Sequence, residues 1–505
     1  MVDRSARLLE RALLFSFVIH GVAMLSMMLL LPGMPGGWTA DGRDRIRYIA
    51  DHPWLWRLGW IPWGLTALSD VLIAIGLLRT SWIPKVPAAI TALVTVAAVL
   101  PDQAGQILWM TRGIELARSG DAAAYFAFEA PIYEWIAVWA GVLYTLGALG
   151  WTWCFASAGT WSRLLTAISA VLWPLFLYSN GGPKLPVAVQ ASPRVVAVGN
   201  ALGFLLLQAW FLLVTEQVLR RSRPDGAHGR EAPWRHPNRL VGSVADLAAN
   251  SRAVRAFTEL LPPLAMVSDI TDVIYVNYLV EADRLRALVP QGLELQTVGP
   301  GGRWSVFTFL TFRHGGFGPR MLGPLRRLMP SPIHTNWRIH VRDPRSDRHG
   351  ITFVTNAIAS TPHALGARLM SEGMPMHVLA GAELRNDAGR IVLRLDPGAG
   401  TGPDADAELR PASPPATGPW SAAFGSWQEM LGYVVPQDRG FSTQPWHARV
   451  TRQEIRLDIP LDACEPLEGR VASNAARAIA GDAEPFCFRV AAVRFRFDAE
   501  EHDPM

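Results

Sequence analysis

The chain has 505 residues, half of them hydrophobic, and a formal net charge of +4 at pH 7. This length allows more than one domain, and the small net charge, with no alternation of basic and aromatic residues, argues against a nucleic-acid-binding protein. Apolar residues are concentrated before Arg220 and charged residues after it, so the sequence has two unlike halves.

The N-terminal half contains six apolar stretches long enough to cross a bilayer, which takes roughly 20 residues. Tryptophans gather at the start of the second stretch and the end of the fourth, as expected at a membrane–water boundary. The sequence therefore predicts a multi-pass α-helical membrane domain of about six spans over residues 1–219. The stretches are 9–31, 54–78, 86–110, 132–155, 164–178 and 195–219.

The basic residues between these stretches indicate an orientation, because cytoplasmic loops carry an excess of arginine and lysine. The excess comes mainly from the arginines between Arg220 and Arg239, directly after the last stretch. This pattern predicts that the N- and C-termini are both cytoplasmic and that the lipid bilayer is a partner of the chain.

Two acidic residues, Asp70 and Asp102, fall inside the predicted spans. An acid at membrane depth is costly and is therefore a candidate functional residue. Two interpretations stay open: a proton or ion path through both side chains, or a structural role in helix contacts and at the membrane interface. The sequence contains no transporter signature.

Residues 220–261 are predicted to form a basic juxtamembrane linker that ends in a helix at 241–261. From residue 262 the pattern changes to short strands with few helices, which predicts a mainly β (α+β), barrel-like soluble domain over 262–505. Residues 396–419, rich in proline and glycine, are predicted to be a surface excursion. The predicted strands are 273–280, 304–312, 336–341, 352–359, 377–384, 391–395, 454–459 and 493–498, and the predicted helices are 281–288, 362–370 and 421–432.

Five segments of the soluble half carry a family resemblance. They are VNYLVEADRLRALVPQGLELQTV, RWSVFTFLTFRHG, HTNWRIHVRD, SEGMPMHVLAGAEL and PWHARVTRQEIRLDIPL. In their order these segments resemble the acetoacetate decarboxylase-like superfamily, and within it an uncharacterised bacterial branch without the catalytic lysine. The resemblance spans residues 270–498 and none of the membrane half. It implies that the chain lies in a bacterial cell (inner) membrane.

In that superfamily a Gly-x-Pro-Lys-Lys run supplies a Schiff-base lysine and a second lysine that lowers its pKa. The matching run here is 373–377, with Met376 at the position of the nucleophile and His377 at that of its neighbour. A thioether cannot form an imine, and no lysine follows Lys184. The sequence thus excludes lysine Schiff-base decarboxylation, while another enzymatic activity stays open.

A cavity like that of the superfamily would be lined by a few polar side chains. His377 would act as a general base or hydrogen-bond donor oriented by Glu372, which makes these two the candidate catalytic residues. Arg338 would hold a carboxylate through two parallel hydrogen bonds. The structural alternative is that strand histidines are satisfied and strand arginines face water. The predicted ligand-binding residues are Arg313, His334, Asn336, Arg338, Met376 and His377.

Motifs for metals and nucleotides are absent from the sequence: it has no HExxH, no CxxC pair, no EF-hand loop and no GxGxxG after a strand. His334 and His340 share one strand face but are too far apart to share a metal. We therefore expect no metal and no cofactor. Nothing in the sequence indicates an oligomeric state.

Three functions stay open. The first is a cytoplasmic β domain that binds a small carbonyl or carboxylate ligand without Schiff-base decarboxylase activity. The second is a lysine-independent lyase or hydrolase that uses His377. The third is a transporter whose soluble domain is regulatory.

Overall fold

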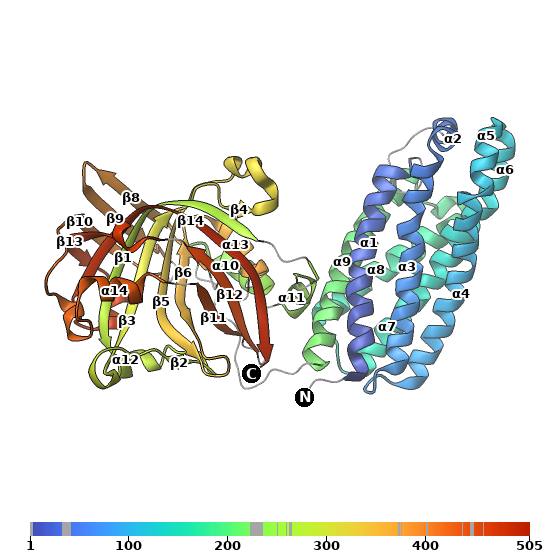
Figure 1. Cartoon of the computed structure of the whole chain (residues 1–505). Helices are drawn as coiled ribbons and strands as arrows, with labels where there is room; N and C mark the ends of the chain where they lie inside the picture. The colour runs from blue at the N-terminus through green and yellow to red at the C-terminus, as the bar shows by residue number, and fades with distance from the viewer. Residues whose placement is uncertain are drawn as a thin grey trace. The chain divides into compact units, whose positions relative to one another are not determined.

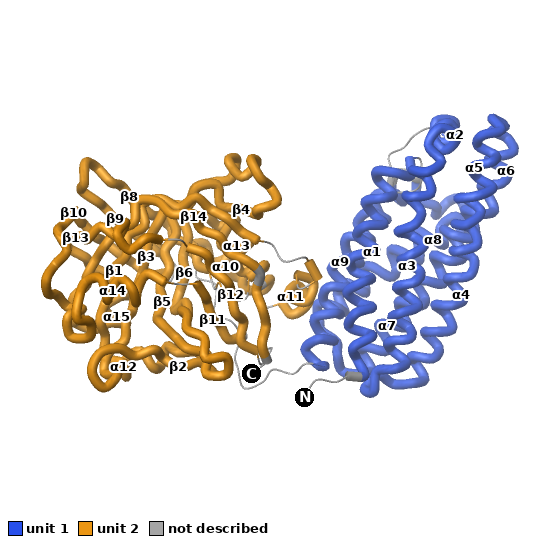
Figure 2. Tube along the Cα trace, viewed as in Figure 1, with its two compact units in different colours: residues 1–224 blue, residues 225–505 orange. Residues whose placement is uncertain are grey.

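The chain divides into two compact units, residues 1–224 and 225–505, which we call the helical unit and the sheet unit (Figures 1 and 2). The structure is a computed structural model. It describes residues 4–32, 42–222, 236–249, 251–258, 260–261, 265–371, 374, 376–399, 402–436, 438–444, 449–457 and 459–504.

The helical unit has six stretches that are long and apolar enough to cross a membrane, so the prediction of six long apolar helices is confirmed. The third stretch combines α4 and α5, and the fourth combines α6 and α7 through the π-helical turn η2 (Glu134–Ala140). The helices are α1 (Arg7–Leu30), α2 (Gly42–Asp51), α3 (Pro53–Arg79), α4 (Lys85–Met110), α5 (Arg112–Ser119), α6 (Ala122–Tyr133), α7 (Gly141–Ser157), α8 (Arg163–Gly181) and α9 (Pro193–Ser222).

An aromatic cluster around Trp210 fills the interior of the helical unit. The Trp210 ring lies 5.3 Å from Trp173 and 6.1 Å from Trp151, and its indole nitrogen donates to the Ser169 hydroxyl at 3.0 Å. Large apolar side chains such as Leu93 lie at the outer surface instead, 73% exposed. A bundle in water would bury such side chains, so this distribution suits a membrane protein.

The sheet unit begins with two short helices, α10 (Arg239–Ala249) and α11 (Arg252–Thr258), in place of the single helix predicted at 241–261. Its other α-helices are α12 (Ala282–Arg286), α13 (Thr361–Met370), α14 (Trp427–Val434) and α15 (Asn474–Ala480). The strands are β1 (Met266–Glu281), β2 (Glu294–Leu295), β3 (Trp304–Arg313), β4 (Gly318–Pro319), β5 (Ile333–Asp343), β6 (Arg348–Ile358), β7 (Met376–Val378), β8 (Gly381–Asp387), β9 (Arg390–Asp396), β10 (Ala405–Pro411), β11 (Arg439–Gln444), β12 (Arg449–Leu457), β13 (Glu465–Ala472) and β14 (Pro485–Pro504).

The main path of the sheet runs β4-β1-β3-β5-β6-β11-β12-β14-β13-β10-β9-β8, and β1 also pairs with β14. In Figure 1 the long strands β1, β3 and β5 run side by side. Between β6 and β11 the register contains a single pair, Gly440 with Ile351. The prediction of a sheet-rich domain is therefore confirmed. A closed barrel is not, because β6 and β11 share only this one pair among the described residues.

Both faces of the central strands are buried, which decides where the site can form. On one face Trp337 stacks on Phe309 with ring centroids 4.5 Å apart. On the other face Tyr275 stacks on Phe488 at 4.4 Å, and α14 adds Trp427 to the same core. Polar side chains on these strands are consequently buried whichever way they point.

Two sequence predictions for this unit are wrong. The excursion predicted at 396–419 contains β10, in which Ala405, Ala407 and Leu409 are buried between more polar neighbours. Small alanines gave this strand a weak apolar signal between proline-rich flanks. The strand predicted at 377–384 is two strands, β7 and β8, separated by Leu379 and Ala380.

Gly469 permits the close approach of β13 to β10, and we expect Gly469→Ala to destabilise the sheet unit. Its φ is +147°, and an added Cβ would lie 2.1 Å from the carbonyl oxygen of Glu408. Strain and backbone displacement together should lower the free energy of unfolding by about 2 kcal/mol or more. Hydrogen exchange of β10 and β13 peptides measures the change. Gly432→Ala is the matched control, because an added Cβ at Gly432 meets nothing within 4 Å; equal protection in the two variants would contradict the prediction.

Candidate functional site

Polar side chains line one face of β5. His334, Asn336, Arg338 and His340 occupy alternate positions and so point to the same side of the sheet. Their neighbour Trp337 points to the opposite core. His334, Arg338 and His340 are only 3%, 1% and 3% exposed.

The register of three neighbouring strands extends this face. Asn336 on β5 is opposite Asn356 on β6, and Asn356 is opposite Met376 on β7. Asn356 is fully buried and Met376 is 1% exposed. We call His334, Asn336, Arg338, His340 and Asn356 the polar strip, with Met376 at its edge.

Many polar atoms of the strip have no hydrogen-bond partner among the described residues. A buried polar atom without a partner costs about 1–3 kcal/mol, so a row of them indicates a place for water or a ligand. The atoms are Nε2 of His334, Oδ1 of Asn336, Nε and Nη2 of Arg338, Nε2 of His340, and Oδ1 and Nδ2 of Asn356.

Arg338 carries the positive charge of the strip. Its guanidinium lies 5.5 Å from the centre of the Tyr275 ring, and burial lowers its pKa to about 10. The side chain therefore remains protonated at neutral pH, although the described residues give it no carboxylate partner within ion-pair distance. A buried cation of this kind is strongly attracted to an anion.

The histidines beside Arg338 are neutral. His314, in the loop after β3, shares a hydrogen bond with Ser268 at 2.8 Å through Nδ1 and another with Nδ1 of His334 at 3.0 Å through Nε2. Burial lowers the pKa of His314 well below its usual value and that of His334 to about 3. Burial, and then the charge of Arg338, lowers the pKa of His340 to about 3. Neutral imidazoles each offer one donor and one acceptor.

The structure separates the predicted site residues into two groups. His334, Asn336, Arg338 and Met376 share the strip face. His377 pairs with Ala357 and so points to the opposite face, where its Nδ1 lies 3.3 Å from Nη2 of Arg368.

Arg313 is also away from the strip, because it donates to the carbonyl oxygen of Leu384 at 3.0 Å. Glu372 lies outside the described residues. The roles assigned to all these residues remain predictions.

Sequence reasoning missed the contributions of His314, Asn356 and Tyr275. His314 directly follows the strand predicted at 304–312, and Asn356 interrupts the apolar strand predicted at 352–359, which are weak signals at most. Among the described residues, no group of three histidine, cysteine or acidic side chains could hold a metal ion.

The two intramembrane acids belong to neighbouring helices, α3 and α4. The Asp102 carboxylate accepts hydrogen bonds from Gln106 at 2.8 Å, from Gln103 at 3.0 Å and from the Tyr144 hydroxyl at 3.0 Å. Asp70 accepts from Ser69 at 3.5 Å. The Tyr144 contact joins α7 to α4, and both the structural interpretation and a transport role remain predictions for these acids.

Comparison with known proteins finds similarity in the C-terminal half. Residues 268–458 match the family model DUF2071, described as an uncharacterized conserved protein, whereas the N-terminal half matches no family model. No curated protein sequence matches the chain.

Solved structures similar to the chain cover 48% of it. One is the enduracididine biosynthesis enzyme MppR with HEPES buffer bound, at 15% identity over 88% of that chain with a TM-score of 0.34. Another is acetoacetate decarboxylase from Legionella pneumophila subsp. pneumophila str. Philadelphia 1, at 11% identity, 87% coverage and a TM-score of 0.34. A third is an acetoacetate decarboxylase-like enzyme from Sphingomonas wittichii RW1, at 11% identity, 95% coverage and a TM-score of 0.35. The similar solved structures thus include acetoacetate decarboxylase-like proteins, as the resemblance read from the sequence predicts.

Proposed function

We propose that the sheet unit binds a small organic carboxylate at the polar strip and that Arg338 holds the carboxylate. The observation that carries this proposal is the buried Arg338 guanidinium, whose Nε and Nη2 lack partners among the described residues. A carboxylate would accept two hydrogen bonds from these donors and compensate the buried charge.

The rest of the strip supports a ligand with further polar atoms. The amides of Asn336 and Asn356 offer donors and acceptors along one row, and the neutral imidazoles of His334 and His340 offer one unpaired ring nitrogen each. A carbonyl or hydroxyl group next to the carboxylate would use them. Small oxo- and hydroxy-carboxylates are therefore the ligand class that fits best.

Binding without Schiff-base chemistry fits the strip better than catalysis. Met376, at its edge, offers no amine, and His377 points to the opposite face. The neutral histidines of the strip would orient a carbonyl group through hydrogen bonds and would not contribute a positive charge. In this proposal the unit is a cytoplasmic ligand-binding domain, held at the bacterial inner membrane by the helical unit with both termini in the cytoplasm.

Binding of pyruvate and acetoacetate to the full chain in lipid nanodiscs tests the proposal. We expect saturation-transfer NMR to detect both acids but not acetone, which has the carbonyl without the carboxylate. Arg338→Met should weaken binding at least about tenfold, because a charge-assisted hydrogen bond contributes about 1.5–3 kcal/mol.

Arg394→Met is the matched control. Arg394 is also in the middle of a strand, but it is 56% exposed and pairs with Glu383 at 3.3 Å. Equal binding by the Arg338 and Arg394 variants, equal binding of acetone, or no binding of either acid would contradict the proposal.

A further inference from the structure

A cavity of about 800 Å³ lies in the sheet unit, and none of the polar-strip residues line it. This volume is within the range of ligand sites, roughly 300–1,000 Å³. Its wall is mostly apolar and rich in methionine, a flexible side chain that adapts to irregular apolar ligands. The wall includes Phe317, Met329, Met370, Met374, Phe495 and Phe497.

Polar lining residues gather where β14 ends. Asp498, Glu500 and His502 on β14 line the cavity together with Ser371, and the further polar lining residues are Arg255, Thr258, His363 and Arg449. The Glu500 carboxylate accepts hydrogen bonds from the Ser371 hydroxyl and, at 2.9 Å, from Nε2 of Gln453. The cavity is thus amphipathic, with an apolar wall and a group of polar residues on β14.

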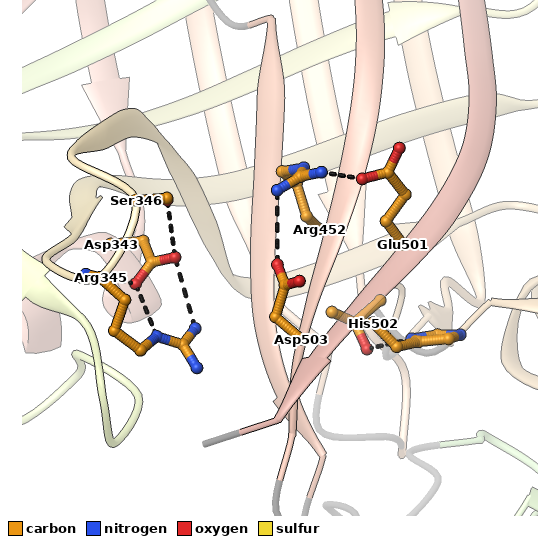
Figure 3. Close-up of polar contacts among 8 residues, drawn as sticks. Asp343, Arg345, Ser346, Arg452, Glu501, His502 and Asp503 are labelled. Atoms are coloured by element: carbon orange, nitrogen blue, oxygen red, sulfur yellow. Dashed lines mark hydrogen bonds and ion pairs between the residues drawn. The ribbon is translucent and has the colours of Figure 1, made fainter.

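Strand alternation keeps Glu501 and Asp503 out of the cavity wall, whereas Asp498 and Arg449 line it. Glu501 and Asp503 alternate with the lining residues of β14 and pair with Arg452 on β12 (Figure 3). His502 instead shares a hydrogen bond with the Thr451 hydroxyl at 3.0 Å. The ion pairs therefore join the two strands, and Glu500 and His502, each with its own hydrogen-bond partner, line the cavity.

Some of the exposed apolar side chains of the sheet unit border the cavity. In the described part of the sheet unit, strongly exposed large apolar side chains occur only on α10, at Leu260 and Leu261, on Met370, and on the 3₁₀ segment η6 (Arg320–Leu328). Leu261 and Met370 also line the cavity, and so do Pro319 and Met329, the residues on either side of η6. The exposed surface is therefore continuous with the cavity wall.

The composition of η6 suits a membrane surface. Met321 and Leu328 are 80% and 82% exposed, and Leu325 is 61% exposed. Arg320 and Arg327 lie in the same segment. Apolar side chains next to arginines favour the interface of a bilayer that contains anionic lipid. A bilayer is also the partner to which the six apolar helices would hold this unit.

We propose that this cavity is a second ligand site, which takes up an acyl-chain amphiphile from the bilayer through the surface formed by η6, Leu261 and Met370. The acyl chain lies against the methionine and phenylalanine wall, and the polar head lies at Glu500 and His502. The site is separate from the polar strip in both position and ligand class.

Photolabelling of the full chain tests the site. The probe is a monoacylglycerol with a diazirine in its acyl chain, added to nanodiscs of phosphatidylcholine and phosphatidylglycerol. We expect labelled peptides from α13 and from the end of β14. Gly366→Phe should reduce this labelling about tenfold, because Gly366 lines the cavity and an added Cβ there meets nothing within 4 Å. The phenyl ring would occupy the cavity without displacing the backbone.

Gly432→Phe is the matched control: Gly432 is a helical glycine with open space, on α14 and outside the cavity wall. Labelling that is equal in the two variants, or confined to the membrane helices, would overturn the proposal.

A second variant tests entry through η6 without changing a residue that lines the cavity. Leu328→Asp replaces a side chain that is 82% exposed, so it should leave folding unchanged. Labelling from the bilayer should fall several-fold. Undiminished labelling of this variant would overturn entry through η6.

Discussion

Arg338→Met is expected to stabilise the sheet unit in the absence of ligand while it removes affinity for small carboxylates. Burial lowers the pKa of Arg338 to about 10, which means that the fold holds the charged form at a cost. Methionine keeps an apolar contact with the Tyr275 ring and removes the charge. Replacing a buried ion pair by apolar side chains is often neutral or stabilises other proteins by about 1–4 kcal/mol. Because Arg338→Met also removes the hydrogen bond with Tyr275, we expect a gain at the lower end of that range, about 1 kcal/mol.

Hydrogen exchange of peptides from β5 and β6 measures this change for the sheet unit alone. A ligand that binds only the folded state stabilises it in proportion to the logarithm of its concentration. Saturating pyruvate should therefore raise the protection of the wild-type chain and leave that of Arg338→Met unchanged. A structural role for Arg338 would give the opposite result, a loss of more than about 1 kcal/mol in the variant without ligand.

Acidification is expected to destabilise the sheet unit below about pH 6.5. His334 and His340 have a pKa of about 3 in the folded state, and that of His314 is also depressed. In the unfolded chain a histidine titrates near 6.5. Between these values the unfolded state binds more protons, so stability is present above about pH 6.5 and is lost as the pH falls toward 3. His334 and His340 should each contribute a loss of about 2 kcal/mol by pH 5.

His340→Phe isolates one of these contributions. Phenylalanine preserves the ring contact with Tyr433, whose centroid lies 4.6 Å away, and cannot be protonated. Hydrogen exchange at pH 7.5, 6 and 5 should show a slope of stability with pH that is smaller by about one proton than in wild type. His349→Phe, at an exposed position of β6, is the matched control. Identical slopes in the two variants would contradict the assignment.

The long apolar helices could be predicted because an apolar run of about 20 residues has few alternative structures. The fourth begins at Ala122 rather than at the predicted residue 132. The predicted limits 54–78 lie within one residue of α3, Pro53–Arg79. The strands of the sheet unit were harder to predict. In β10, for example, two of the buried positions are alanines, so the alternation of apolar and polar residues is weak. The sparse pairing between β6 and β11 could not be predicted from local sequence, because it depends on contacts between segments far apart in the chain.

Only part of the candidate site could be predicted from the sequence, because the rest also depends on tertiary structure. Alternation places His334, Asn336 and Arg338 on one side of β5, but both sides of that strand are buried. Periodicity therefore could not identify the side on which the unpartnered polar atoms of the strip gather. The choice between Met376 and His377 depended on the parallel pairing of β7 with β6, in which Met376 is opposite Asn356. That register comes from tertiary structure.

The single residue pair that joins β6 to β11 also bears on how fast a ligand can exchange. Separating strands that meet at one position breaks far less of the backbone ladder than separating β5 from β6, which are paired along most of their length. Local opening there requires only a small part of the free energy of global unfolding. A molecule bound inside the sheet could then leave when β6 and β11 separate locally. Its residence time would depend on the rate of this local opening as well as on its affinity.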